Sequence, residues 1–503
     1  MKPILRLLLF ILPLYAATAC GDDDPSESTP QPEAVTLVSS QPATGATNVD
    51  LSTKTITLTY SAEVNFASGV KADFNGQSVA LTSFAKSTAT PNVMTFTIPA
   101  PLELGQSYTL SIPEGFFTSK ASGDNVPAHS VTFSTKEKTN VDPSSIATSL
   151  VTPSPSKEAK ALYEYLLSIY GQKILSSTIA NVNWNLDEAD MVNAATGKYP
   201  AIATFDYIHS YTLYDDASRN PYKGGWRINY DDISQFAQWW EDGGIVSGCW
   251  HWNVPNKQAD KYGQDAYTCT PGSGEKNSDG QMTTLFRPKN IFVDGSWEKQ
   301  IADQDLELIA SLLKKFQEAN IPVIWRPLHE ASGNATMGGT AWFWWGIDGA
   351  ETYVKLWRYM FDYFKSQGIN NLIWVWTTQT GYGYDPSKGI LYDTDWYPGD
   401  EYVDIIGRDE YTKTTEESFA EFDAIRASFP NKMITLSECG DVAKLSDLFN
   451  AGAIWSWAMP WYDYDADNTA HSLDNHQYAN TAWWTDAMNC NHVVSRDLLP
   501  NLK

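Results

Sequence analysis

Two short segments carry a glutamate at or near their C-terminal end, in surroundings that suggest chemistry. The first, IPVIWRPLHE at residues 321–330, runs from apolar residues into an arginine, a histidine and Glu330. The second, MITLSECG at residues 433–440, carries Glu438. Each apolar run predicts a buried strand, and burying a charge is costly, so a carboxylate at its end is expected to face a cleft. The alternative is a strand that leaves the core for solvent, where most glutamates lie.

Eight apolar segments within residues 155–503 predict the elements that position these glutamates. They are residues 173–178, 201–207, 243–252, 321–330, 371–378, 403–411, 433–440 and 452–461. Helical patterns separate most of them, such as the stripe of Leu306, Ile309 and Leu313. Alternating strands and helices in this number predict an α/β TIM (β/α)8 barrel. A doubly wound open sheet is the alternative, but no glycine-rich phosphate turn follows an early strand.

In a barrel of this kind, the C-terminal strand ends face one shared cleft. The polar and aromatic residues at the predicted strand ends are His251, Trp252, Arg326, His329, Glu330, Gln379, Asp409, Tyr411, Glu438, Trp457 and Trp461. Two carboxylates flanking a bond are what glycoside hydrolysis requires, and aromatic rings suit the apolar faces of sugars. The alternative for either histidine and for Tyr411 is a structural role in the barrel.

Other chemistries find little support in the sequence. It contains no HExxH, no paired CxxC and no calcium loop of EF-hand spacing, so we expect neither a metal nor a cofactor. A G-x-S-x-G nucleophile turn is also absent. The net charge of −25 argues against nucleic acid or an anionic membrane surface as a partner. We expect a neutral polysaccharide substrate, and the oligomeric state is open.

The N-terminal residues 1–19 are typical of a lipoprotein signal peptide. Lys2 and Arg6 precede a short apolar run, and small residues lead to Cys20, the expected lipidation site. The acidic residues after Cys20 resemble the surface-export signal of Bacteroidetes lipoproteins, which implies a lipid anchor in the bacterial outer membrane, facing the cell surface. The alternative is an ordinary secretory signal with a chance cysteine. Residues 20–33 are a Pro/Ser/Glu-rich linker.

Residues 34–137 predict an all-β sandwich, and residues 138–154 a second linker. Alternating apolar positions such as Ile56, Leu58 and Tyr60 predict half-buried strands, and the Asn75-Gly76 pair predicts a hairpin turn. None of the 20 Trp precedes Trp184, which separates this region from the barrel. The segments QPATGATNVD, PLELGQSYTLSIPEG and VTFSTK resemble a bacterial Ig-like domain. We expect it to act as a spacer, with carbohydrate binding as the alternative.

The barrel region resembles glycoside hydrolase family 26. The resemblance rests on GCWHWNVP (248–255), WRPLHE (325–330), WFWWG (342–346), WYPGDEYVDIIGRDEYT (396–412) and LSECG (436–440). It implies a retaining enzyme, most often an endo-β-1,4-mannanase that cleaves mannan, galactomannan or glucomannan. A mixed-linkage β-glucanase, a β-1,3-xylanase or a mannobiose-releasing enzyme is the alternative. A further alternative is a surface glycan-binding lipoprotein without catalytic activity.

The resemblance also assigns roles to residues by position. It implies that Glu330 is the acid/base and Glu438 the nucleophile, and that Tyr411 hydrogen-bonds the nucleophile. It implies sugar contacts for His251, His329, Trp342 and Trp461. From their places at predicted strand ends, we also expect Trp252, Arg326 and Trp457 to contact the sugar.

Two departures from the family pattern bear on these assignments. The segment 331–341 is longer than in many members, and Tyr462 follows Trp461 where some members have arginine. Both departures bear on how the substrate chain is held. We expect Cys269 and Cys490 to stay unpaired.

Overall fold

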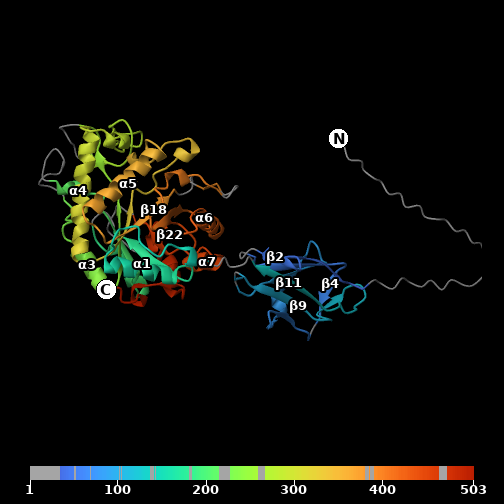
Figure 1. The fold of residues 1–503 in the computed structure, drawn as a ribbon. Helices are drawn as coiled ribbons and strands as arrows, with labels where there is room; N and C mark the ends of the chain where they lie inside the picture. The colour runs from blue at the N-terminus through green and yellow to red at the C-terminus, as the bar shows by residue number, and fades with distance from the viewer. Residues whose placement is uncertain are drawn as a thin grey trace, which may run out of the picture. The chain divides into compact units, whose positions relative to one another are not determined.

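The computed structural model describes residues 34–503 with internal gaps. The gaps are residues 50–52, 68, 101, 104, 136–140, 142, 181–183, 215–226, 259–266, 380–383, 386–389 and 464–472. The described residues form two compact units, a smaller β unit within residues 34–135 and a larger α/β unit that extends to Lys503 (Figure 1). The predicted signal peptide, Cys20 and the linker at 20–33 lie outside the described residues.

The smaller unit consists of two main sheets that share one core. The first sheet contains β1 (Leu37–Gln41), β3 (Thr55–Tyr60), β8 (Val93–Thr97) and β7 (Phe84–Lys86), in that order. The second contains β2 (Ala46–Val49), β11 (His129–Thr135), β9 (Ser107–Ile112), β5 (Ala72–Phe74) and β6 (Gln77–Val79). The strands pair antiparallel except β2 and β11, which pair in parallel. Leu58 and Phe96 from the first sheet join Leu110 and Phe133 from the second in one hydrophobic cluster. The predicted all-β region is therefore confirmed.

The Asn75-Gly76 pair forms the turn between β5 and β6. Phe74 pairs with Gln77, so two residues make the connection, and both have positive φ, 52° for Asn75 and 78° for Gly76. Two-residue hairpins favour positive φ at both turn positions, which Asn and Gly accept at low cost. The hairpin prediction is confirmed.

The larger unit contains a closed parallel barrel of eight strands. In chain order these are β12 (Ile174–Ile179), β13 (Ile202–Asp206), β14 (Ile245–Trp250), β17 (Val323–Pro327), β18 (Leu372–Thr378), β21 (Ile405–Tyr411), β22 (Met433–Gly440) and β23 (Trp457–Pro460). Each strand pairs with its neighbour in the sequence order, and β12 pairs with both β13 and β23 to close the barrel. The predicted (β/α)8 fold is confirmed, with every predicted strand in its expected place.

Amphipathic helices cover the outside of the barrel, and Figure 1 shows α4 (Trp297–Glu318) and α5 (Ala350–Ser366) along it. The apolar stripe of α4 that the sequence predicts, from Leu306 to Phe316, is fully buried. Helix α6 (Thr415–Ser428) begins with a capping box in which Thr414 and Glu417 satisfy each other's backbone N–H groups. Among the described residues, no helix has the length and apolarity needed to cross a bilayer.

Candidate active site

Three carboxylates meet at the C-terminal ends of the barrel strands. Glu330 follows β17, Asp409 lies in β21 and Glu438 lies in β22, and one oxygen from each lies within 4.8 Å of the others. The register between β21 and β22 shifts after Arg408, so that Asp409 pairs with Glu438. Irregular pairing of this kind re-aims side chains and is common beside active sites. The structure thus brings the two predicted glutamates together.

Arg326 supplies a positive charge that offsets the repulsion among these three carboxylates. Its Nη2 donates to Oε2 of Glu438 at 2.8 Å and also to Asp409, while its Nε donates to Thr377 at 3.1 Å. The guanidinium is only 4% exposed. Because removing one partner of a buried ion pair leaves an uncompensated charge, Arg326 holds the site together. This differs from the sugar contact predicted for Arg326.

The electrostatic environment of Glu330 suits a proton donor. Burial raises the pKa of Glu330 well above its ordinary value, and the nearby charges of Asp409 and Glu438 raise it further. Burial also raises the pKa of Asp409, to about 7, against the opposing effect of Arg326. Glu330, with its raised pKa, is suited to act as the acid, and the arginine-bound carboxylate of Glu438 is suited to act as the nucleophile. Different surroundings thus give the two carboxyl groups different roles.

The backbone at Glu330 is held in an uncommon conformation. Leu328 and Glu330 both have a φ of 50°, in the left-handed region that residues with a side chain seldom adopt. Two side chains brace this turn: Tyr353 donates to the carbonyl of Leu328 at 3.0 Å, and Trp345 donates to the carbonyl of His329 at 2.9 Å. Backbone strain that is fixed by its surroundings is typical of functional sites.

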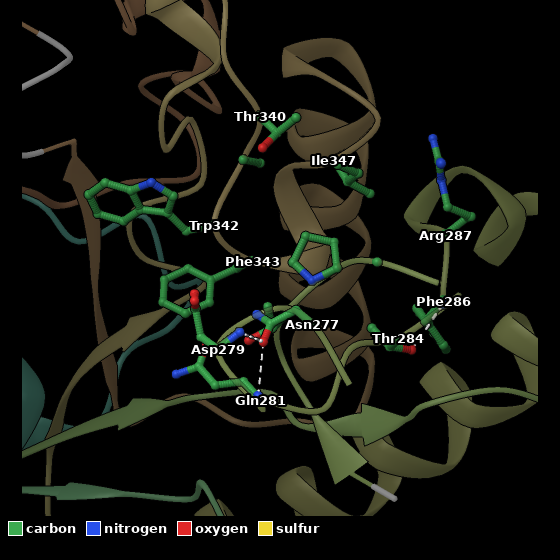
Figure 2. Close-up of a pocket in the computed structure, with 14 residues that line it drawn as sticks. Asn277, Asp279, Gln281, Thr284, Phe286, Arg287, Thr340, Trp342, Phe343 and Ile347 are labelled. Atoms are coloured by element: carbon green, nitrogen blue, oxygen red, sulfur yellow. Dashed lines mark hydrogen bonds between the residues drawn. The ribbon is translucent and has the colours of Figure 1, made fainter. Parts of the chain in front are cut away.

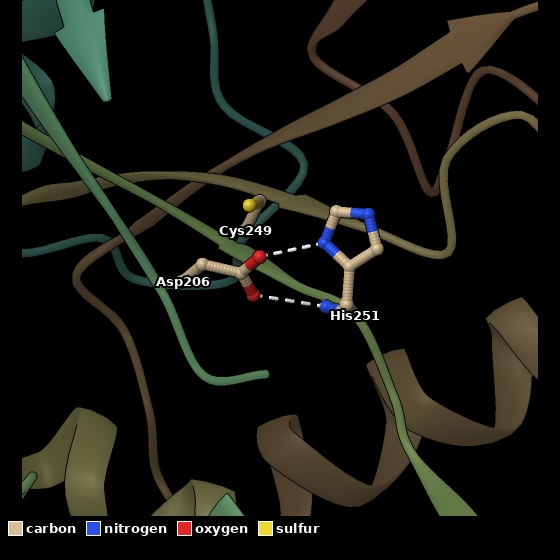
Figure 3. A group of neighbouring side chains, drawn as sticks. All are labelled: Asp206, Cys249 and His251. Carbon is tan, nitrogen blue, oxygen red and sulfur yellow. Dashed lines mark hydrogen bonds and ion pairs between the residues drawn. The ribbon is translucent and has the colours of Figure 1, made fainter. Parts of the chain in front are cut away.

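Two histidines lie beside the carboxylates with their rings 4.4 Å apart. Asp206, at the end of β13, accepts from the backbone N–H of His251 at 3.0 Å and lies 2.6 Å from its Nδ1 (Figure 3). Burial lowers the pKa of His251, but the charge of Asp206, its hydrogen bond to the ring and the charge of Glu438 together outweigh burial, so the net shift is upward. Burial, with the charges of Arg326 and His251, lowers the pKa of His329 well below its ordinary value. Of the two histidines, His251 is therefore the one that more readily carries a positive charge, and His329 is the neutral one.

Aromatic rings surround the histidines. The ring of Phe343 lies 5.3 Å from His329 and 5.8 Å from His251, and the ring of Trp461 lies 5.5 Å from His251. In the WFWWG segment, Trp344 and Trp345 are fully buried, whereas Trp342 and Phe343 are half-buried. The segment thus divides between packing and the cleft.

The predicted sugar contact of Trp252 is corrected by the structure. Its side chain is fully buried, stacks on Trp250 at 4.2 Å and donates from Nε1 to Asp305 of α4 at 2.8 Å. Successive residues of an extended chain point in opposite directions, so His251 faces the cleft and Trp252 faces the helix layer. Trp457, in β23, is 3% exposed, and its contact with sugar stays a prediction.

Sequence reasoning missed three residues of the site. Asp206 ends β13, and its place at a strand end was the signal that could have identified it. Asp409 lies at a predicted strand end, but the sequence indicates no role for it. Phe343 lies between Trp342 and Trp344 in the WFWWG motif, and nothing in the sequence distinguishes it from its neighbours. The four cysteines among the described residues are free, Cys269 and Cys490 included.

Two clusters have the donor types of a metal site, but their chemistry fits other roles. In the first, Arg326 already places a cation between Asp409 and Glu438. In the second, Asp206 is bound to His251, and burial raises the pKa of the Cys249 thiol well above its ordinary value. The Asp206 carboxylate of this cluster holds the backbone and the ring of His251 and so positions the imidazole.

The closed barrel, with glutamates at the ends of its fourth and seventh strands, defines the class of barrel glycosidases that act through a carboxylate pair. The chain belongs to glycosyl hydrolase family 26, whose model matches residues 151–486. Residues 31–135 match the model of a bacterial Ig-like domain.

Two proteins of known structure are similar to the barrel region of this chain. The GH26 domain of an endo-β-mannanase/endo-β-glucanase from Prevotella bryantii is 41% identical, with a TM-score of 0.61, and the match covers 70% of this chain and 99% of that one. A β-mannanase from a symbiotic protist of the termite Reticulitermes speratus, solved with a gluco-manno-oligosaccharide, is 32% identical, with a TM-score of 0.54, and the match covers 71% and 98% of the two chains.

A mannan endo-1,4-β-mannosidase of Thermothelomyces thermophilus is 33% identical over 323 residues, which is 64% of this chain and 58% of that protein. The chain spans about half the length of the first curated relatives it matches, with shares of 58%, 50% and 48%.

Proposed function

We propose that this chain is an endo-acting β-1,4-mannanase that cleaves the backbones of mannan, galactomannan and glucomannan with retention of configuration. The observation that carries the proposal is the approach of the Glu330 and Glu438 oxygens to within 4.8 Å. Carboxyl groups about 5–5.5 Å apart are typical of retaining glycosidases, and a separation of about 6.5–9.5 Å is typical of inverting ones. The β-mannanase names of the relatives support the choice of mannan.

In the proposed reaction, Glu438 attacks the anomeric carbon while Glu330 gives its proton to the departing glycosidic oxygen. Tyr411 and Arg326 hold one oxygen of Glu438 each and so orient the attack. Once Glu438 is an ester its charge is gone, and one of the charges that raise the pKa of Glu330 is removed. Glu330 then takes a proton from water, whose oxygen bonds to the anomeric carbon as the ester bond to Glu438 breaks. The sugar is released with its configuration retained, and Glu438 is a carboxylate again.

A panel of glycans tests the substrate. The chain is incubated with mannan, glucomannan, barley β-glucan and β-1,3-xylan, and product sizes are followed over time. We expect a mixture of oligosaccharides from the mannans at early times, and NMR of the anomeric proton should show the β-configuration first. Glu438→Ala is the matched control and should bind mannan without cleaving it. Disaccharide as the sole early product contradicts endo action, and α-configured first products contradict retention.

The same panel separates the alternatives. A mixed-linkage β-glucanase has some support from the printed name of the Prevotella bryantii protein, which includes endo-β-glucanase. Faster cleavage of barley β-glucan than of mannan would favour it. Binding without products from any glycan would favour a glycan-binding lipoprotein.

We also propose that Cys20 carries a lipid that anchors the protein in the bacterial outer membrane, facing the cell surface. The supporting pattern is the basic, apolar and small-residue order that ends at Cys20 in the sequence. Cys20→Ala should move the protein from the membrane fraction to the soluble fraction, while a cut by external protease should release the wild-type barrel from whole cells. Unchanged membrane association of the variant contradicts the anchor.

A further inference from the structure

The turn that begins at Glu330 is closed by one backbone N–H that has two acceptors. The N–H of Gly333 donates to the carbonyl of Glu330 at 3.2 Å and to the side-chain Oε1 of Gln379, also at 3.2 Å. Gln379 directly follows β18, and β18 pairs with β17, the strand that leads to Glu330. The Gln379 side chain therefore ties the Glu330 turn to the next strand of the barrel.

Gln379 does not face the cleft, although its place at the end of a predicted strand suggests that it would. Its exposed fraction is 0%, so it has no surface with which to contact a substrate. A buried amide of this kind can influence a reaction only through the groups that it holds. The group held by Gln379 is the backbone of the turn that carries the candidate acid.

The end of β18 is itself firmly fixed. The backbone N–H of Gln379 donates to Oδ2 of the buried Asp393 at 2.6 Å. The hydroxyl of the preceding residue, Thr378, accepts from Nη1 of Arg408 at 3.2 Å, and Arg408 is bound in turn to Glu421 at 2.7 Å. A side chain that extends from a strand end held in this way has little freedom, as the support of a catalytic group requires.

Gly333 is the point at which the Glu330 turn joins the longer loop that follows. Its φ is 47°, and a Cβ atom there would lie 2.6 Å from the backbone N of Trp342 and 2.9 Å from Cα of Ala341. The two ends of the loop thus meet at Gly333, with room for glycine alone. Because residues 337–340 at the loop's far end are exposed, the hydrogen bond from Gln379 fixes the loop at its base.

The segment that returns from this loop has a cavity on one side. Residues 340–347 form one wall of a cavity of about 740 Å³, and residues 270–287 form the other (Figure 2). Thr340, Trp342 and Phe343 are seen along it in Figure 2. A segment beside a cavity makes fewer packing contacts than one inside a core, so packing alone fixes it less firmly. This leaves the hydrogen bond from Gln379 as an important support for the turn.

We propose that Gln379 is a positioning residue for the proton donor, which holds the Glu330 turn so that the carboxyl group meets the glycosidic oxygen. This inference rests on the proposed function and adds a residue to its mechanism. In the first step, the Glu438 carboxylate bonds to the anomeric carbon, the bond to the leaving oxygen breaks, and the proton of Glu330 passes to that oxygen. A leaving group that departs as a stable anion does not need this proton.

Two aryl β-mannobiosides separate the positioning of the acid from a general effect on the barrel. Phenyl β-mannobioside has a poor leaving group that needs the proton, whereas dinitrophenyl β-mannobioside releases a stable phenolate. Gln379→Met in the full chain should lower kcat/KM about ten-fold on the phenyl substrate and leave the dinitrophenyl substrate within about two-fold. Equal losses on both substrates, or an unchanged phenyl rate, would overturn the proposal.

Asn371→Leu is the matched control. Asn371 is a buried amide just before β18, and its Nδ2 donates to the carbonyl of Ile321, just before β17, at 2.8 Å. It therefore ties the same two strands together at the opposite end of the barrel. Any loss in Asn371→Leu should be equal for the two aryl substrates. The same selective loss on the phenyl substrate in this control would contradict a specific role of Gln379.

Gln379→Glu tests whether the accepting oxygen is what matters. Nε2 of Gln379 makes no hydrogen bond with any residue that the structure describes, so this change keeps the oxygen and replaces an atom that holds nothing there. The phenyl rate should stay within about three-fold of the wild type. A loss as large as that of Gln379→Met, in a variant with a normal thermal unfolding transition, would overturn the proposal.

Thermal unfolding of each variant shows whether it folds. If Gln379→Met does not fold, Gln379→Asn replaces it with the same expected result, because its side chain is one methylene too short to reach Gly333. A wild-type chain that cleaves neither aryl mannobioside shows that the proposed function is wrong. Wild-type cleavage without the selective loss in the Gln379 variants overturns the positioning role alone.

Discussion

The hydroxyl of Tyr411 donates a 2.7 Å hydrogen bond to Oε1 of Glu438, while Arg326 binds Oε2 of the same carboxylate. Both oxygens of the candidate nucleophile are therefore held by side chains from other strands. A carboxylate held in this way has little freedom to rotate, and well-oriented groups react faster because the entropy of positioning is already lost.

Tyr411→Phe should lower kcat about 10–100-fold, since a hydrogen bond to a charged group is worth about 1.5–3 kcal/mol. KM should change little, because the phenol acts on Glu438 and not on bound sugar. Steady-state kinetics on mannohexaose provides the measurement. Tyr207→Phe is the control, since it removes a buried hydroxyl for which the described residues supply no hydrogen-bond partner. Equal losses in the two variants would contradict the role of Tyr411.

The basic limb of the pH profile should depend on Asp409. Glu330 must hold a proton to act as an acid, so kcat/KM falls as the pH rises through its raised pKa. Asp409→Asn removes one of the charges that raise this pKa, and the basic limb should move to lower pH. The pH dependence of kcat/KM on an aryl mannoside with a poor leaving group gives the measurement.

Glu410→Gln is the matched control for Asp409→Asn. It changes the next residue of β21, which faces α6 because strand residues alternate. A basic limb that stays in place in Asp409→Asn, or that moves equally in both variants, contradicts the assigned coupling.

Asp206 should control the charge and orientation of His251. Asp206→Asn removes the opposite charge that raises the pKa of His251, so this pKa should fall, as NMR titration of the imidazole would detect. The loss of a charge-assisted hydrogen bond should reduce kcat/KM about 10–100-fold. Asp305→Asn is the control, because Asp305 is also buried but binds Trp252 behind the barrel strands. An unshifted His251 titration in Asp206→Asn contradicts this assignment.

Glu410 should make the barrel less stable as the pH rises. Burial, followed by the charge of Glu421, raises the pKa of Glu410 to about 8 in the folded chain. In the unfolded chain the pKa of a glutamate is about 4.3. Between these two pKa values Glu410 keeps its proton only in the folded state, so the free energy of unfolding falls as the pH rises. Glu410→Gln carries no such proton.

Thermal unfolding across this pH range tests the role of Glu410. The Tm of Glu410→Gln should fall less than that of the wild type between about pH 4 and about pH 8. Glu416→Gln, an exposed position on α6, is the control and should follow the wild type. Parallel Tm curves for wild type and Glu410→Gln would contradict the buried titration.

Much of the architecture could be predicted from the sequence because its signals are local. Apolar runs at 321–327 and 433–437 indicate buried strands, and counting the strands places Glu330 and Glu438 on the fourth and seventh. The Thr414 capping box and the Asn75-Gly76 turn depend on side chains and backbone a few residues apart. Patterns of this range need no knowledge of tertiary contacts.

The direction of individual side chains was harder to predict. His251 and Trp252 are adjacent and were both assigned to the cleft, but an extended backbone sends them to opposite sides. Arg326 was assigned to sugar, whereas its partners Asp409 and Glu438 lie on two other strands that close around it. The charge of a buried group is determined by such partners, which the order of residues in one segment does not reveal.

Local patterns in the sequence are enough to predict a (β/α)8 barrel with two opposed glutamates, because hydrophobic periodicity specifies each strand locally. The folded chain places Arg326 between Asp409 and Glu438, brings Asp206 to His251, and makes residues 270–287 and 340–347 line a common cavity. Electrostatic coupling and cavity shape, by contrast, arise between segments that meet only when the barrel closes.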